Sequence, residues 1–203
     1  MGGELWTTEQ FAIDYTQLGP NNSVLNGKGP YQIPSSWWAY GKPVLAVANG
    51  VVVQAADGVP DTVPVGTDPK IEDETAAGSH VMLDIGGGHY VEYEHLKPGS
   101  VAVKAGQMVK VGQLLGNVGT SGSSFNPHLH FQVIDRPDSL KAHGLPFVFD
   151  TQLLEGRVPP EFTNGVFSKV EAGDVVPIDT TGHGVKLNLM PERNGVFDFN
   201  LPR

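Results

Sequence analysis

Apolar and polar residues alternate in several short runs of this chain, and turn-forming residues separate the runs. The clearest alternation covers residues 80–85 and 89–96, on either side of Gly86-Gly87-Gly88. A period of two is typical of a strand with one buried face, and the glycine triplet predicts the turn of a hairpin. Long runs with a helical period are missing from the sequence, so the pattern predicts an all-β chain.

Strands are also expected in the N-terminal part of the chain. Residues 10–18 form a short apolar run, and two further apolar runs, 43–48 and 51–53, flank Asn49-Gly50. Asn-Gly accepts the positive φ of tight turns. We therefore expect the strands on either side of this dipeptide to pair as a hairpin.

Two polar stretches predict long surface loops: residues 19–34, rich in Asn, Gly and Pro, and the acidic residues 57–78. A Lys-x-Gly-Gln phrase opens residues 104–109 and again residues 110–115. Each copy predicts a compact turn followed by a strand. A further strand is expected over 128–134.

After this strand the composition changes to scattered short apolar runs. We therefore expect two parts, a main domain over residues 1–146 and a C-terminal β extension over residues 147–203 that packs on the core. The length of the chain, 203 residues, permits one ordinary core with a small appended unit.

Charge and composition exclude several classes of protein. The net charge is −9 with scattered Lys and Arg, which argues against a nucleic-acid partner. We expect no membrane span, and the first residues lack the pattern of an export signal, so that such a signal would have been removed. Because the chain has no Cys, any metal ion must be held by His, Asp, Glu or amide groups.

Two histidines form the sharpest candidate site. On a strand, His128 and His130 point to one face, roughly 6–7 Å apart, while Leu129 and Phe131 point to the other. One imidazole is then placed to bind a metal ion while the other faces water or substrate. The alternative is an ordinary pair of surface histidines.

His95 and Asp14 are further candidates. His95 ends a strand, which is a good place to aim a polar group into a cleft, and alternation places it on the face of Val91 and Tyr93. Asp14 is a single carboxylate inside an apolar run, where a buried charge needs a partner or a metal ion. A core-edge histidine and a structural aspartate are the alternatives.

Taken in order, these segments resemble consecutive motifs of peptidase family M23, the LytM-like or lysostaphin-type zinc metallopeptidases. The resemblance covers roughly residues 43–133. Its motifs are Ala46-Val47-Ala48-Asn49-Gly50-Val51-Val52-Val53, Gly78-Ser79-His80-Val81 with Asp84, Tyr93-x-His95-Leu96, the two Gly-Gln phrases, and residues 119–131 ending in Pro127-His128-Leu129-His130-Phe131.

The resemblance implies a fold, a cofactor and roles for the candidate residues. The fold would be a LytM-like duplicated hybrid motif of β-sheet, with long surface loops and the small C-terminal β appendage. One zinc ion (Zn2+) per chain would be held by Asp14 and His130, with His95 and His128 catalytic. The implied activity is endopeptidase cleavage of cell-wall peptidoglycan peptides, in the periplasm or outside the cell, and in some cases attached to the envelope. The substrate-binding residues stay unassigned.

One position departs from the family pattern. Gln10 stands four residues before Asp14, where the family has a histidine ligand. An amide oxygen is a much poorer zinc ligand than an imidazole. This departure keeps a second hypothesis open, a degenerate M23-like domain that binds wall peptides or regulates a partner hydrolase without cutting.

A carrier function is a weaker alternative. The Gly-Gln phrases also resemble the turns of biotinyl and lipoyl carriers. A biotinyl carrier needs an exposed Met-Lys-Met hairpin, and the corresponding strand here reads Val81-Met82-Leu83-Asp84.

Overall fold

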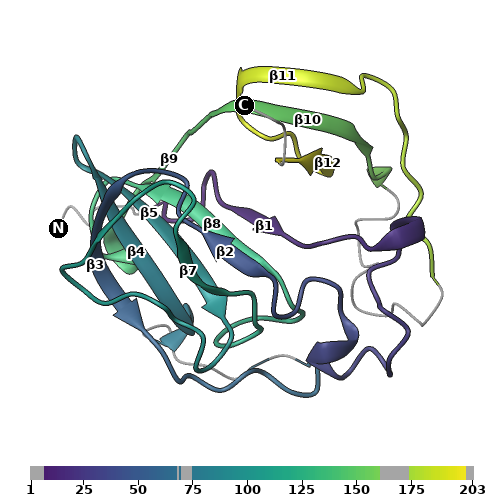
Figure 1. Cartoon of the computed structure of the whole chain (residues 1–203), viewed down its shortest axis with the longest axis horizontal. Helices are drawn as coiled ribbons and strands as arrows, with labels where there is room; N and C mark the ends of the chain where they lie inside the picture. The colour runs from purple at the N-terminus through teal and green to yellow at the C-terminus, as the bar shows by residue number, and fades with distance from the viewer. Residues whose placement is uncertain (1–6, 68, 70–74, 161–173, 200–203) are drawn as a thin grey trace, which may run out of the picture.

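The chain folds almost entirely into β-structure, as Figure 1 shows for the computed structural model. The structure describes residues 7–67, 69, 75–160 and 174–199. All strand pairs within these residues are antiparallel. The prediction of an all-β chain is confirmed.

A seven-stranded main sheet forms the centre of the molecule, with strand order β1-β8-β5-β4-β3-β6 and β9 paired to β8. The strands of the main sheet are β1 (Ile13–Tyr15), β3 (Gly50–Ala56), β4 (Ser79–Gly86), β5 (His89–Leu96), β6 (Met108–Val109), β8 (Leu129–Ile134) and β9 (Gly144–Leu145). A small separate sheet pairs β2 (Pro43–Leu45) with β7 (Leu114–Asn117). Short 3-10 helices in the described part of the chain include η1 (Pro20–Asn22), η2 (Pro34–Ser36) and η4 (Ser139–Lys141).

The hairpin between β4 and β5 forms as the sequence predicts. Gly86, Gly87 and Gly88 have φ values of 87°, 67° and 76°, a left-handed run that L side chains rarely adopt. The glycine triplet therefore makes the tight connection between β4 and β5 possible. These are the two strands in which apolar and polar residues alternate most clearly.

The predicted hairpin at Asn49-Gly50 is wrong, because β2 and β3 belong to different sheets. β2 pairs with β7, and β3 pairs with β4 and β6. Gly50 has no positive φ; a Cβ there would lie 2.5 Å from the carbonyl oxygen of Asp84. Asn49 accepts a hydrogen bond from the backbone N–H of Val111 at 2.9 Å. Gly50 therefore allows β3 to pass close to β4, and Asn49 holds a neighbouring segment. Neither residue forms a hairpin turn.

The repeated Lys-x-Gly-Gln phrase makes the same turn twice, as predicted. Gly106 and Gly112 have φ values of 84° and 81°. In each copy the glutamine side-chain oxygen accepts the backbone N–H of the lysine three residues earlier, at 3.3 Å for Gln107 and 3.2 Å for Gln113. The first turn leads into β6 and the second into β7.

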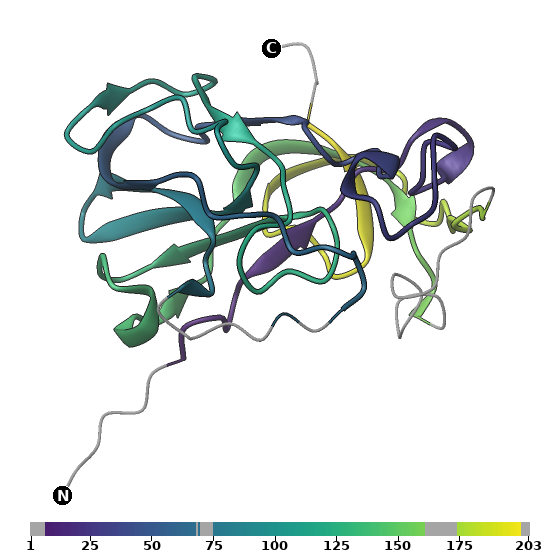
Figure 2. The same ribbon diagram turned by 90° about the horizontal axis from the view of Figure 1, so that it is seen from below.

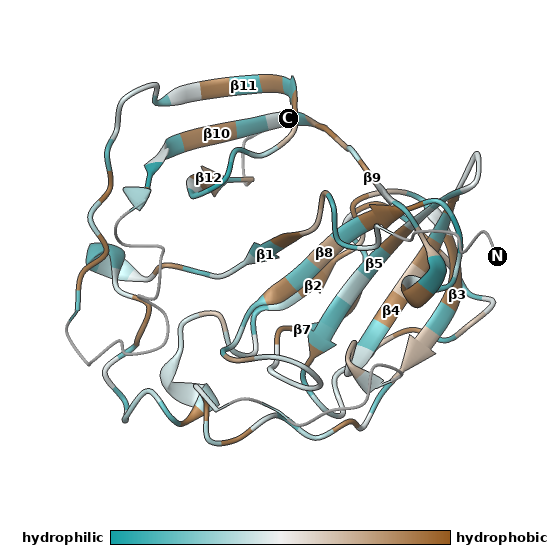
Figure 3. Ribbon diagram, turned by 180° about the vertical axis from the view of Figure 1, so that it is seen from behind, coloured by the Kyte–Doolittle hydropathy of each residue, from teal (hydrophilic) through white to brown (hydrophobic). Residues whose placement is uncertain are grey.

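One face of the main sheet is apolar and packs into a hydrophobic core. Figure 3 shows hydrophobic and hydrophilic residues alternating along β4, β5 and β8. Tyr93 and Phe131 are buried on this face, with ring centroids 5.4 Å apart. A one-residue slip would move them to the opposite face and forfeit roughly 1.5–3 kcal/mol for each. Burial of these apolar residues fixes the register of the strands. The polar residues that alternate with them along β5 and β8 therefore point to the opposite face of the sheet. The buried members of the core include Val52, Val81, Leu83, Val91, Tyr93, Leu96, Leu115, Phe131 and Val133.

The first expected loop, residues 19–34, is better packed than its composition predicts. Val24 is fully buried and contributes, with Trp37, to a second hydrophobic cluster. Val158 and Val176, far along the chain, complete that cluster. This stretch therefore links the N-terminal part of the molecule to the C-terminal part.

Of the second expected loop, residues 57–78, positions 68 and 70–74 lie outside the described residues. Asp61 accepts hydrogen bonds from the Tyr40 hydroxyl and from the backbone N–H of Thr120, the latter at 2.9 Å. The loop is thereby tied to the segment that precedes β8.

The C-terminal part forms a three-stranded sheet of its own, in the order β11-β10-β12. Its strands are β10 (Phe149–Arg157), β11 (Gly184–Leu189) and β12 (Gly195–Asp198). Phe199 lies 6.0 Å from Tyr15 and 5.1 Å from Phe149 between ring centroids, and Figure 2 shows this sheet beside β1. Aromatic contacts therefore join the two sheets. The division into domains at residue 146 stays a prediction.

Candidate active site

Three histidines gather on the polar face of the main sheet. His130 lies in β8 and His128 just before it, while Leu129 and Phe131 pack toward the core, as the alternation predicts. Both histidines are buried, with 9% of His128 and 8% of His130 exposed, so they are not the ordinary pair of surface histidines that was the alternative.

His95 completes this histidine group from β5. Its ring centroid lies 4.8 Å from that of His128 and 5.9 Å from that of His130. The prediction that His95 shares a face with Val91 and Tyr93 is therefore wrong.

The backbone at His95 explains the difference. Its φ is 60°, which breaks the alternation, so that Leu96 enters the core in its place. The backbone N–H of His95 donates to the carbonyl of Ala77, and its carbonyl accepts from Gly119, both at 3.0 Å. Its ring Nδ1–H donates to the carbonyl of Ser121 at 2.9 Å. Neighbouring loops thus hold this strained residue in place.

Asp14 joins the histidines from β1. Its Oδ1 lies 2.9 Å from Nδ1 of His130 and 3.5 Å from Nε2 of His128. The Asp14 side chain is 64% exposed, so this carboxylate lies at the solvent edge of the cluster and is not buried as its apolar run had indicated. The structure therefore brings together all the candidate residues of the sequence: Asp14, His95, His128 and His130.

The hydrogen bonds fix which ring nitrogen is free on two of the histidines. Nδ1 of His128 donates to the carbonyl of Asn126 at 2.7 Å, and Nδ1 of His95 donates to Ser121. In a neutral imidazole the other nitrogen then carries the lone pair. His95 and His128 consequently present Nε2 as an acceptor or ligand atom.

Burial and neighbouring charges separate the pKa values of the cluster. Burial lowers the pKa of His95, and the charges of His128 and His130 lower it further, to about 3. Burial also lowers the pKa of His128. For His130, burial acts in the same direction, but the hydrogen bond to Asp14 and the charges of Glu94 and Asp14 outweigh it and raise its pKa to about 9. Burial raises the pKa of Asp14, and its hydrogen bond with His130 and the histidine charges bring that pKa below the ordinary value.

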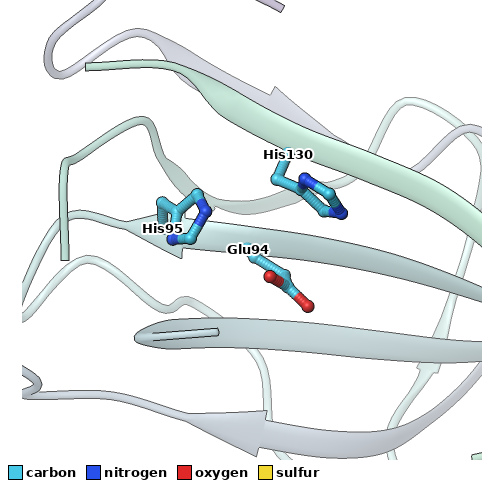
Figure 4. A group of neighbouring side chains, drawn as sticks. All are labelled: Glu94, His95 and His130. Carbon is cyan, nitrogen blue, oxygen red and sulfur yellow. The ribbon is translucent and has the colours of Figure 1, made fainter. Parts of the chain in front are cut away.

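Glu94 is a site residue that the sequence analysis missed. It lies directly opposite His130 in the pairing of β5 with β8, and it is 8% exposed. One donor atom each from Glu94, His95 and His130 lie within 4.8 Å of one another, and Figure 4 shows the three side chains on their neighbouring strands. Burial raises the pKa of Glu94 well above its usual range, and the charge of Glu92 adds to this. The only sequence signal for it was its place in the Tyr-x-His-Leu motif.

Gln10, His80 and His89 make no described side-chain hydrogen bond to this cluster. Gln10 is exposed in the turn before β1, and no described hydrogen bond joins its side chain to the site residues. The ring of His80 bonds to the carbonyl of Gly78 at 2.9 Å, and His89 is exposed at the hairpin.

The chemistry of these donors fits a zinc ion. Zinc bonds of about 2.0 Å in tetrahedral geometry place two ligand atoms roughly 3.3 Å apart. The separations from Asp14 Oδ1 to the nitrogens of His130 and His128, 2.9 and 3.5 Å, bracket this value. Three buried imidazoles, with the Asp14 carboxylate at their solvent edge, make a candidate metal centre of the kind that metallopeptidases use.

Comparison with known proteins gives the family. A model described as "Peptidase family M23" matches residues 37–142, more than half of the chain. The chain belongs to peptidase family M23, whose members are metalloendopeptidases. The matched residues include the three site histidines and Glu94, whereas Asp14 and Gln10 lie before them.

Two curated relatives illustrate the family. The chain is 31% identical over 96 residues to "Peptidoglycan DD-endopeptidase ShyA" of Vibrio cholerae serotype O1, covering 47% of this chain and 18% of that protein. It is 30% identical over 115 residues to "Lysostaphin" of Staphylococcus simulans, covering 56% of this chain and 20% of that protein. The chain thus spans about a fifth of the length of these relatives.

A solved structure also matches, the catalytic domain of lysostaphin from Staphylococcus simulans. It is 28% identical, with a TM-score of 0.39, over 57% of this chain and 83% of that chain. Among the described residues, the structure has no helix that is long and apolar enough to cross a bilayer.

Proposed function

We propose that this chain is a zinc-dependent endopeptidase that hydrolyses peptide bonds in bacterial cell-wall peptidoglycan. One observation carries the proposal: the predicted residues Asp14, His95, His128 and His130, from three different strands or their ends, meet at one point of the sheet. The names of the relatives support the substrate class, since they include a peptidoglycan DD-endopeptidase and lysostaphin.

Asp14 and His130 are the proposed metal ligands. Their facing atoms, Oδ1 and Nδ1, share a proton in the metal-free chain, and a zinc ion would take the place of that proton. When bound, zinc supplies Lewis-acid chemistry, polarising a peptide carbonyl and lowering the pKa of a water molecule.

His95 and His128 are the proposed catalytic residues. Their low pKa values keep them neutral near pH 7, with Nε2 as a lone-pair acceptor. In the proposed mechanism, Nε2 of one of these two rings accepts the proton of the attacking water. Once protonated, the same ring nitrogen donates a hydrogen bond that stabilises the oxyanion or passes the proton to the leaving amine.

The proposed partners are peptidoglycan peptides, and the proposed location is the periplasm or the cell exterior, where that polymer lies. Both follow from the family's substrates. The net charge of −9 would favour peptides that carry free amines.

The exposed position of Gln10 favours a second candidate function. A chain that lacks one histidine ligand would hold zinc weakly and act as a non-catalytic domain that binds wall peptides or regulates a partner hydrolase. The two candidates share the fold and differ in turnover.

Purified peptidoglycan separates the two candidates. The wild-type chain, supplied with zinc, should release new peptide amines from it, and neither a chelated sample nor His128→Ala should do so. Binding to peptidoglycan without any release of amines would support the non-catalytic candidate and contradict the proposed activity.

A further inference from the structure

We propose that Ser124 is a positioning residue for His128, and that its hydroxyl group keeps the proton of the neutral ring on Nδ1 and leaves Nε2 free as an acceptor. This inference rests on the proposed function and names how one of its two catalytic histidines is held. Ser124 acts through the His128 ring and not on the substrate.

The hydroxyl of Ser124 stands at the centre of three hydrogen bonds. Its Oγ lies 2.9 Å from the carbonyl oxygen of Asn126, 3.0 Å from the hydroxyl of Thr120 and 3.3 Å from Nδ1 of His128. The Asn126 carbonyl oxygen in turn lies 2.7 Å from the same Nδ1. The serine hydroxyl, the carbonyl and the ring nitrogen therefore form a closed triangle of contacts.

The direction of each bond follows from the chemistry of the partners. A carbonyl oxygen only accepts, so Ser124 donates its single proton to Asn126. The two lone pairs of the hydroxyl then accept from the hydroxyl of Thr120 and from Nδ1–H of His128. The hydrogen-bonding capacity of Ser124 is thereby fully used, and Nδ1 of His128 faces two acceptors.

Two acceptors at Nδ1 decide the tautomer of His128. The hydrogen bonds that the two ring nitrogens make set which of them carries the proton. A proton on Nε2 would leave the lone pair of Nδ1 against the Asn126 carbonyl at 2.7 Å. Ser124 can satisfy that lone pair only by turning its proton away from Asn126. The arrangement therefore favours the proton on Nδ1.

Burial prevents water from replacing these bonds. Ser124 and Thr120 are fully buried, and His128 is 9% exposed. The backbone N–H of Thr120 donates to Asp61 at 2.9 Å, which anchors the hydroxyl chain to the loop of residues 57–78. A continuous series of protein hydrogen bonds thus runs from Asp61 to the His128 ring.

The tautomer matters for the proposed reaction because a general base must present a lone pair to the water molecule. A His128 ring with its proton on Nε2 would present a donor there instead. A catalytic histidine held in the wrong tautomer can lose on the order of 10⁴-fold in kcat. Ser124 thus supports turnover without touching the reacting atoms.

NMR of the isotopically labelled imidazole nitrogens in metal-free protein tests the inference without any turnover. The wild-type chain should carry the His128 proton on Nδ1. Ser124→Ala should shift the tautomer ratio toward Nε2–H by about fivefold or more, the weight of one hydrogen bond. Thr120→Val, which removes the donor to Ser124, should shift the ratio in the same direction, whereas Thr120→Ser should retain the wild-type ratio.

Ser79→Ala is the matched control. Ser79 is also fully buried, and its hydroxyl accepts the backbone N–H of Val59 at 3.1 Å; no described hydrogen bond joins this hydroxyl to a histidine. The control should keep the wild-type tautomer ratio of His128. Circular dichroism verifies that each variant is folded.

Kinetics on peptidoglycan give a second readout. Ser124→Ala should lower kcat at least about 10-fold, while KM and zinc content stay within about twofold of wild type. Ser79→Ala should keep kcat within about twofold. A merely structural defect would instead lower the amount of folded, zinc-loaded protein.

The outcomes separate this inference from the function on which it rests. A folded Ser124→Ala variant with the wild-type tautomer ratio would overturn the role of Ser124 and leave the proposed peptidase standing. A wild-type His128 with its proton on Nε2 would also overturn that role. A zinc-loaded wild-type chain that releases no peptide amines would overturn the proposed function, and the tautomer ratio would still decide whether Ser124 positions the ring.

Discussion

Asp14 Oδ1 lies 2.9 Å from His130 Nδ1, although the two residues are 116 positions apart in the chain. The antiparallel pairing of β1 with β8 creates this contact, and the buried Phe131 fixes its register. The contact places a carboxylate and an imidazole where one ion can bind both.

His130→Ala should abolish zinc retention, because it removes the imidazole on which the ligand set is centred. His95→Ala and His128→Ala should keep zinc and lose turnover, since their proposed role is proton transfer. Elemental analysis and peptidoglycan hydrolysis on the same preparations check both statements. A His130→Ala protein with its full zinc content would show that the metal site is wrongly placed.

His89→Ala provides the matched control for these variants. His89 is exposed at the β4–β5 hairpin, so its replacement should leave zinc content and turnover unchanged. Loss of zinc in this control would mean that the other variants report a general effect of removing histidines.

Gln10→His should raise zinc affinity by at least about 10-fold, because an imidazole is a far better zinc ligand than an amide. Gln10→Ala should change the affinity less than about twofold, since the exposed amide holds no ligand position. Chelator competition measures both. Unchanged affinity in Gln10→His would show that this turn does not reach the ion.

His95→Gly should be more stable than His95→Ala by about 1 kcal/mol in metal-free protein, because glycine adopts a positive φ without a Cβ clash. The φ of 60° at His95 is the basis of this expectation. Urea unfolding of the two variants gives the difference. A more stable alanine variant would contradict a left-handed backbone at this position.

Stability should fall at alkaline pH because of buried tyrosines. Burial raises the pKa of Tyr93, whose hydroxyl accepts the backbone N–H of Val47 at 3.0 Å. The folded state thus keeps this phenol neutral while the unfolded chain ionises it above about pH 10. The stabilisation is fully present below that pH and is lost as the pH rises above it.

Tyr93→Phe isolates that contribution. The variant cannot ionise at this position, so its free energy of unfolding should depend less on pH between about pH 9 and 11 than that of the wild type. Urea unfolding at several pH values measures the two slopes. Parallel slopes would show that Tyr93 does not carry the effect.

Much of the fold was predictable where the signal is local. The Gly86-Gly87-Gly88 turn and the two Lys-x-Gly-Gln turns follow from backbone requirements of a few adjacent residues. The common face of His128 and His130 follows from the two-residue period of a strand. These features need no knowledge of which strands pair.

The errors arise where distant segments decide the outcome. Asn49-Gly50 has the composition of a turn, but Gly50 is needed because β4 passes close to it at Asp84. His95 leaves its expected face because loops from other parts of the chain hold a backbone conformation that histidine rarely adopts. Glu94 was missed because only the register of β5 against β8 places it opposite His130.

The zinc content of the untagged wild-type chain, dialysed against trace zinc and measured by elemental analysis, tests the account most directly. We predict about one zinc ion per chain, because Asp14 and His130 place a carboxylate and an imidazole where one ion can bind both. A folded chain that retains no zinc would contradict the metallopeptidase account.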